Sequence, residues 1–247
     1  FREYASWRNS QTAESGNKVH SVLALEEPES HLHPQAQRSL FSHIKQVTGQ
    51  RIVSTHSPYF AGQAKLEELR LFRKSKGDTT VTSLDTGALD NDDVRKLQYG
   101  VIDSRGDILF TRGLVLFEGQ TEEQALPVYA DKYWGATIHE LGFCFVRVNG
   151  TDYFPFIWLA RELDIPWYVF ADGEPKPVTD LNKALKRAGE PEASKCGNVV
   201  VLPGGNGFEP YLIAEGYLPE IELAIDEVEG KTSFLDDYVT RMQGQKK

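Results

Sequence analysis

The sequence has few cysteines and no long apolar segment. Cys144 and Cys196 are its only cysteines, too few for the disulfide framework of a small secreted domain. No apolar run approaches the ~20 residues that cross a bilayer. The opening segment FREYASWRNS also lacks the layout of a signal peptide. We therefore expect a protein of the reducing cytoplasm, without a membrane partner.

Basic residues are scarce in the second part of the chain. The net charge is −9 over 247 residues. Residues 1–110 carry 14 basic and 14 acidic side chains, whereas residues 111–247 carry 13 and 22. This balance argues against broad coating of nucleic acid. It leaves two readings of the second part open: an acidic solvated face, or carboxylates that converge on cations.

Short apolar segments alternate with amphipathic ones along the chain. The expected strands are residues 19–25, 51–55, 69–73, 79–84, 114–117, 143–148, 167–171 and 199–202. The expected helices start near Pro34 and Asp90 and continue at residues 121–134, 152–163, 179–188, 208–215, 220–229 and 233–242. The alternation predicts an α/β fold with a mainly parallel sheet and helices on both faces. Residues 101–113 look like a connector, so we place two domains at residues 1–110 and 111–247.

Acidic residues follow three expected strands of the second part. Glu118 ends one strand and Glu122 falls in the first turn of the next helix, where Thr121 is the expected cap. The strand WYVFA ends in Asp172 and Glu174. Glu209 follows the last strand after the flexible segment 204–207. In an open α/β sheet, binding sites form beyond the carboxyl ends of the strands.

Five carboxylates brought together in this way would repel one another. Two like charges at ~4 Å cost about 1 kcal/mol in water and several times that in a partly closed site. Two Mg²⁺ or Mn²⁺ ions would offset this repulsion, because hard cations prefer oxygen ligands. Such a pair can stabilise both the attacking and the leaving oxygen of a phosphodiester. Taken singly, each acid has an ordinary structural explanation, and the prediction rests on their combination.

The acidic motifs of the second part resemble those of a known domain. The run LFEGQTE at residues 116–122, followed by FADGE at residues 170–174, looks like a Toprim domain. The EGxTE form is similar to the OLD (overcoming lysogenization defect) nucleases. This resemblance implies metal binding by Glu118, Glu122, Asp172, Glu174 and Glu209, with Glu118, Asp172 and Glu174 as the catalytic acids.

In OLD nucleases an ABC-type ATPase precedes the Toprim domain, and the first part of the chain resembles one. The segment VLALEEPE at residues 22–29 is similar to a Walker B strand, and VSTHSP at residues 53–58 to the switch-histidine motif. The resemblance implies that Glu26 holds Mg²⁺, that Glu27 polarises the attacking water and that His56 contacts the γ-phosphate of ATP. The structural alternative for His56 is a strand-end histidine with satisfied hydrogen bonds.

Several family features are absent or altered. The sequence has no GxxxxGK[ST] loop and no ABC signature, so we expect a C-terminal fragment that does not hydrolyse ATP by itself. The usual Asp-x-Asp pair is Asp172-Gly173-Glu174 here. OLD nucleases also place a lysine late in the chain, near the scissile phosphate, and this lysine has no clear match here. Lys231 is one candidate, while Lys246 and Lys247 suggest that a basic tail follows.

The leading hypothesis is a metal-dependent deoxyribonuclease of an ATP-regulated OLD type. Its expected partners are DNA and the missing N-terminal ATPase half, and the sequence leaves the oligomeric state open. The main alternative is a non-catalytic DNA-binding or docking half of an SMC-like ATPase machine. Topoisomerase or primase activity is disfavoured, since no tyrosine stands out as a nucleophile and no nucleotide-binding basic residues are seen.

Overall fold

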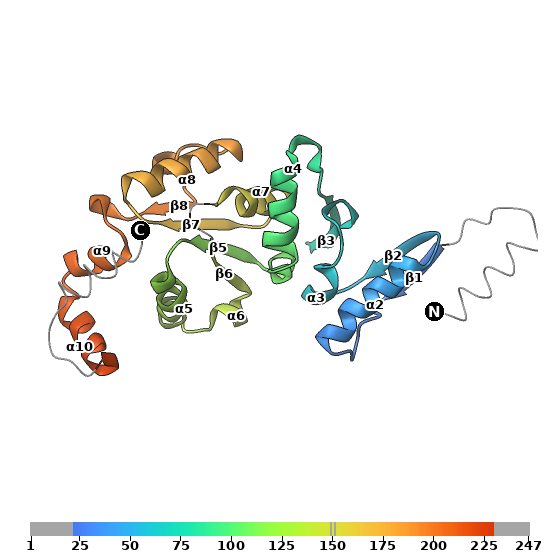
Figure 1. The fold of residues 1–247 in the computed structure, drawn as a ribbon, viewed down its shortest axis with the longest axis horizontal. Helices are drawn as coiled ribbons and strands as arrows, with labels where there is room; N and C mark the ends of the chain where they lie inside the picture. The colour runs from blue at the N-terminus through green and yellow to red at the C-terminus, as the bar shows by residue number, and fades with distance from the viewer. Residues whose placement is uncertain (1–21, 149, 151, 230–247) are drawn as a thin grey trace, which may run out of the picture. The chain divides into compact units, whose positions relative to one another are not determined.

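The computed structural model describes residues 22–148, 150 and 152–229 (Figure 1). The expected helix at residues 233–242, the first residues of the expected strand at 19–25, and the lysines 231, 246 and 247 lie outside the described residues. Contacts divide the chain into two compact units. The first comprises residues 1–115, 135–145 and 153–167, and the second residues 116–134, 146–152 and 168–247. The domain boundary near residue 110 stays a prediction.

The described elements alternate as expected (Figure 1). The strands are β1 (Val22–Glu26), β2 (Gln50–Ser54), β3 (Arg70–Ser75), β4 (Asp78–Ser83), β5 (Gly113–Phe117), β6 (Phe143–Arg147), β7 (Trp167–Ala171) and β8 (Val199–Val201). The α-helices are α2 (Pro34–Gln46), α3 (Pro58–Ala61), α4 (Asn91–Arg95), α5 (Gln120–Trp134), α6 (Ile138–Leu141), α7 (Phe154–Glu162), α8 (Pro175–Arg187), α9 (Phe208–Ala214) and α10 (Leu218–Glu229). Among the described residues, no helix has the combined length and hydropathy of a bilayer span.

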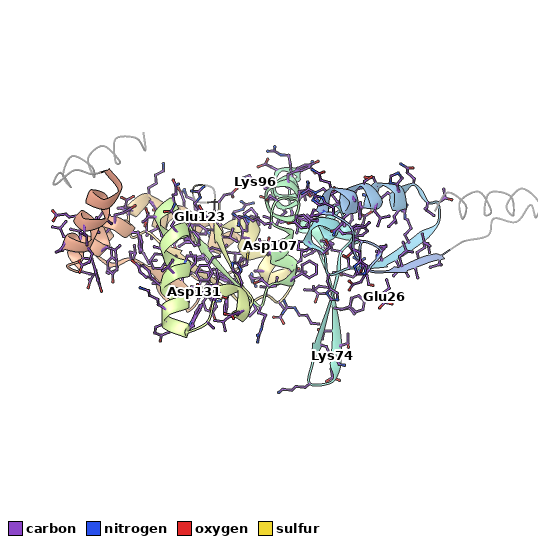
Figure 2. The ribbon with its side chains drawn as sticks, turned by 90° about the horizontal axis from the view of Figure 1, so that it is seen from below. Glu26, Lys74, Lys96, Asp107, Glu123 and Asp131 are labelled. Atoms are coloured by element: carbon purple, nitrogen blue, oxygen red, sulfur yellow. The ribbon has the colours of Figure 1, made fainter. Side chains whose placement is uncertain are left out.

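The first unit begins with a parallel strand pair. β1 and β2 pair in register from Val22 opposite Gln50 to Glu26 opposite Ser54, and α2 connects them. β3 and β4 form an antiparallel hairpin, with Lys74 on β3 in Figure 2. The parallel pair brings the chain segments that follow β1 and β2 to the same end.

The second sheet has the strand order β6-β5-β7-β8, and β7 pairs in parallel with β8. β5 is buried on both faces: Leu114, Leu116 and Phe117 are all 0% exposed. A strand buried on both sides is typical of a parallel sheet covered by helices. The expected α/β class with a parallel sheet is confirmed.

Two expected segments differ in the structure. α8 begins at Pro175 rather than at residue 179, because proline fits the first helical turn, where its missing N–H costs nothing. The expected connector at 101–113 is ordered. A π-helix at Lys96–Ile102 and a 3₁₀ helix at Gly106–Phe110 bury Ile102 and Ile108 completely.

A half-buried thiol lies next to an acid in the first unit. Cys144 on β6 donates a hydrogen bond to Oδ2 of Asp107 at 3.3 Å. Burial, together with the negative charge of Asp107, raises the pKa of the Cys144 thiol to about 12. The thiol therefore stays protonated at neutral pH.

We predict that Leu116→Ala lowers the free energy of unfolding by about 2–5 kcal/mol, because it leaves a cavity in the fully buried β5. Val200 on β8 is 59% exposed, so Val200→Ala should change this free energy by less than about 0.5 kcal/mol. Urea denaturation followed by circular dichroism measures both. Equal midpoints would contradict the assignment of β5 to the core.

We also predict that Cys144 resists alkylation by iodoacetamide at pH 8, since only the thiolate reacts. Asp107→Asn removes the neighbouring charge and should speed alkylation of Cys144, read by mass spectrometry of the labelled peptide. Cys196 is buried and lies outside this pair, so its slow labelling should be the same in both proteins and serves as the internal control. An unchanged rate in Asp107→Asn would show that the acid does not act on the thiol.

Candidate functional site

The direction in which the chain adds strands to the sheet reverses between β5 and β7. The chain places β6 on one side of β5 and then β7 on the other, which is a topological switch point. Ligands of open α/β sheets bind beyond the strand ends at such a point. Glu118 follows β5 and Asp172 follows β7, so two of the predicted acids flank it. Both side chains are half-buried.

The loop after β7 is locked to the loop after β8. Leu202 donates its backbone N–H to the carbonyl of Ala171 at 2.9 Å, and Gly173 donates to the carbonyl of Asn206 at 2.8 Å. A Cβ on Gly173 would lie 2.1 Å from the carbonyl oxygen of Leu202, so only glycine fits this approach. The segment around 204–207 is therefore held against the Asp172 loop.

Asp172 faces this second loop. A Cβ on Gly207 would lie 3.6 Å from Oδ2 of Asp172, which shows how closely the carboxylate approaches that backbone. Oδ1 of Asp172 is buried. The structure thus places Asp172 between the ends of β7 and β8.

A third loop joins through a side-chain hydrogen bond. The Thr121 hydroxyl at the start of α5 donates to Oε1 of Glu209 at the start of α9, at 2.5 Å. The sequence predicts Thr121 as the cap of α5, but the helix already begins at Gln120. The Thr121 hydroxyl instead contacts α9. The segment after β8 therefore contacts both the segment after β5 and the loop after β7.

Glu122 is the most buried of the predicted ligands, at 3% exposed. Its carboxylate fills the space beside Gly119, where a Cβ would lie 1.8 Å from Oε2. The next acid, Glu123 on α5, pairs with Arg147 at 3.3 Å (Figure 2 labels Glu123). Glycine at position 119 thus makes room for the Glu122 carboxylate.

Glu174 occupies the N-cap position of α8, with an exposed side chain that makes no capping hydrogen bond. Glu209 is also exposed. Within the described residues, no three His, Cys, Asp or Glu side chains gather closely enough to hold a metal ion. The donors have the oxygen chemistry that Mg²⁺ or Mn²⁺ requires and lie on linked loops. The metal site itself stays a prediction.

Two of the three predicted ATP-site residues meet in the first unit. Nε2 of His56 lies 3.3 Å from Oε1 of Glu27, and the His56 side chain is 85% exposed. Glu27 has a positive φ of 39° and donates its N–H to the carbonyl of Ser54 on β2. Glu26 ends β1 with an exposed side chain (Figure 2). The turn after β1 therefore carries the Glu27 side chain toward His56.

Glu29, the last acid of EEPE, has no role among the sequence-based predictions. It is 3% exposed and accepts a hydrogen bond from the Thr55 hydroxyl. The Ser57 N–H donates to the same hydroxyl at 3.0 Å, and the Ser57 hydroxyl donates to Gln37 on α2. This network fixes both neighbours of His56. In the sequence Glu29 is one of three acids in the polar run EEPES, so no local pattern singles it out.

Two family descriptions match separate parts of the chain. Residues 109–173 match the TOPRIM domain of overcoming lysogenization defect protein-like proteins. Residues 1–61 match the AAA ATPase domain. The first match includes Glu118, Glu122 and Asp172 and ends before Glu174 and Glu209, while the second includes the acidic segment at 22–29.

Two curated relatives are similar over most of the chain. The OLD nuclease of Thermus scotoductus is 33% identical over 197 residues, which are 73% of this chain and 36% of that protein. The uncharacterized protein YbjD of Escherichia coli K12 is 27% identical over 62% of this chain and 28% of its own length. The aligned part therefore spans about a third of these relatives.

Solved structures also resemble the chain. The C-terminal region of the Xanthomonas campestris OLD protein is 22% identical with a TM-score of 0.43, covering 56% of this chain and 70% of that one. The C-terminal region of the Burkholderia pseudomallei OLD protein is 21% identical with a TM-score of 0.39, covering 52% and 70%.

We predict that Gly173→Ala destabilises the chain by about 1–3 kcal/mol, because the added Cβ meets the Leu202 carbonyl oxygen. Gly197→Ala is the matched control, since its Cβ would have no neighbour within 4 Å. Urea midpoints of the two variants give the comparison. Equal stabilities would mean that the loops after β7 and β8 are not locked together.

Proposed function

This chain carries an OLD-like Toprim domain preceded by ATPase-type sequence, and from that premise we propose that it is a metal-dependent DNA nuclease. The reaction is hydrolysis of a phosphodiester bond. The observation that supports it is the placement of Glu118 and Asp172 on either side of the sheet's switch point. The relative named OLD nuclease supports the same class of activity.

Asp172 is the central metal ligand in this proposal. It leaves β7 and faces the backbone of Gly207, so its position is fixed by two strands. Glu118 lies at the end of the neighbouring strand, and Glu122 is buried beside Gly119. Glu174 and Glu209 are exposed and would complete the ligand set.

Two bound Mg²⁺ or Mn²⁺ ions would activate a water molecule and neutralise the departing oxygen. The residues of the chain supply the frame for this chemistry. Thr121 holds Glu209 through its hydroxyl, and Gly173 keeps the Asp172 loop against β8. No base-reading motif is present in the sequence, so we expect contacts mainly to the DNA backbone and little sequence preference.

The pair Glu27 and His56 would serve ATP hydrolysis in a longer protein. Glu27 would orient the attacking water and His56 would contact the γ-phosphate, with Glu26 holding Mg²⁺. The 247 residues contain no GxxxxGK[ST] loop, so the chain alone should not turn over ATP. We assign the protein to the cytoplasm, with DNA and an ATPase half as partners, and its oligomeric state stays open.

The second candidate is a non-catalytic platform that docks DNA for an ATP-driven machine. One observation favours it: within the described residues, no three metal-binding side chains gather. It predicts that no divalent ion binds near Asp172 and that DNA is never cut.

We predict that the chain nicks supercoiled plasmid DNA in Mn²⁺ without ATP, and that EDTA abolishes nicking. Asp172→Ala should lower the rate by more than about a hundredfold. Replacing even a residue that only hydrogen-bonds to a metal ligand typically lowers metal affinity or activity by roughly 10- to 100-fold. The control is Glu220→Gln, which changes an exposed acid of α10. Agarose gels give the rates.

Isothermal titration with Mn²⁺ separates the two candidates. Wild-type binding that is weakened in Asp172→Ala supports the metal site even before cutting is measured. Absence of both Mn²⁺ uptake and nicking would refute the nuclease and leave the platform. Nicking that survives Asp172→Ala would refute the site.

A further inference from the structure

Helix α8 (Pro175–Arg187) has a basic outer face. The unit formed by residues 116–134, 146–152 and 168–247 has seven lysines and arginines within its described part, and α8 carries four of them: Lys176, Lys183, Lys186 and Arg187. Acids far outnumber bases elsewhere in this part of the unit. The concentration of positive charge on one helix therefore contrasts with its surroundings.

The four cations lie along one side of the helix. Lys176, Lys183 and Arg187 are spaced by seven and four residues, which places them in a line on a 3.6-residue helix. All four basic side chains are exposed. The opposite side packs inward, with Leu181 and Leu185 both 0% exposed. The line from Lys176 to Arg187 is about 16 Å long.

Helix stability does not explain Lys176. It lies in the first turn, where the helix dipole disfavours a cation by about 0.3–1 kcal/mol. Lys183 donates to Asp180 at 2.7 Å, but an exposed pair of this kind contributes little. Neither Lys176 nor Lys186 forms an ion pair with a described residue. Lys186 and Arg187 lie in the last turn, where the helix dipole favours cations, so helix stability accounts for that end of the face but not for Lys176.

The position of α8 in the chain indicates which kind of polyanion its basic face would bind. Pro175, its first residue, comes three residues after Asp172, so the basic line starts beside the proposed metal site and runs away from it. A line of about 16 Å follows roughly five base pairs of a DNA strand. A membrane surface fits less well, because α8 exposes no large apolar side chain among its described residues.

We propose that the outer face of α8 binds the phosphate backbone of DNA and holds it over Asp172. This rests on the proposed nuclease function, since it names the surface that positions that substrate. The contacts are to phosphates, so they strengthen binding without reading sequence.

The test compares two double variants that remove equal charge. Lys176→Gln/Lys186→Gln changes α8, while Lys74→Gln/Lys132→Gln changes exposed lysines of β3 and α5. Glutamine is a good helix former, which suits the three helical positions, and Lys74 is exposed on the strand β3, so both variants should fold; circular dichroism checks this. Binding of a fluorescent 20-base-pair duplex is measured by anisotropy in EDTA from 50 to 200 mM salt.

The α8 variant should bind about tenfold or more weakly at 100 mM salt. Its slope of log affinity against log salt should fall by about 1.8, because each lost phosphate contact removes ~0.9. The control variant should stay within about twofold of wild type. In Mn²⁺, the α8 variant should show a raised KM for cleavage and a nearly unchanged kcat.

The outcomes separate this proposal from the nuclease itself. If the wild type cuts DNA but the α8 variant binds it with unchanged affinity and salt slope, the proposal for the α8 surface is wrong and the proposed nuclease function stands. Binding that depends on α8 without cutting in any metal supports the surface and overturns the nuclease. No binding by wild type at 50 mM salt overturns the surface.

Discussion

The close approach of the β7 and β8 loops is the constraint on which the candidate site depends. Gly173 lies so near the Leu202 carbonyl that no side chain fits between them. The hydrogen bond from Gly173 to Asn206 closes the same contact. This lock sets Asp172 against Gly207 and leads the chain into α9, where Glu209 meets Thr121. One backbone contact thereby links loops from three strands of the sheet.

The region around Glu27 and the region around Asp172 are built in the same way. In each, a parallel strand pair brings two following loops to the same end. After β1 and β2 the result is the pair of Glu27 and His56, supported by the buried Glu29 network. After β7 and β8 the result is the Asp172 loop against the glycine-rich segment. Parallel pairing thus brings together chain segments that are distant in sequence.

Charge is divided within the second unit in a way that suits a polyanionic substrate. The acids lie at strand ends, where divalent ions would offset their repulsion. Four of the seven described lysines and arginines of the unit lie on α8, which begins directly after Glu174. The proposed contact with DNA would thus run through one local surface of a chain whose net charge of −9 opposes the approach of a polyanion.

The sequence determined the alternation of strands and helices, the acids that end β5 and β7, and the resemblance to OLD proteins. Periodicity and turn residues are local, so they are readable along the chain. The order β6-β5-β7-β8, the pairing of Thr121 with Glu209 and the role of Glu29 came only from the tertiary structure. These features join residues far apart in sequence, and their energy comes from packing and hydrogen bonds that no local pattern records.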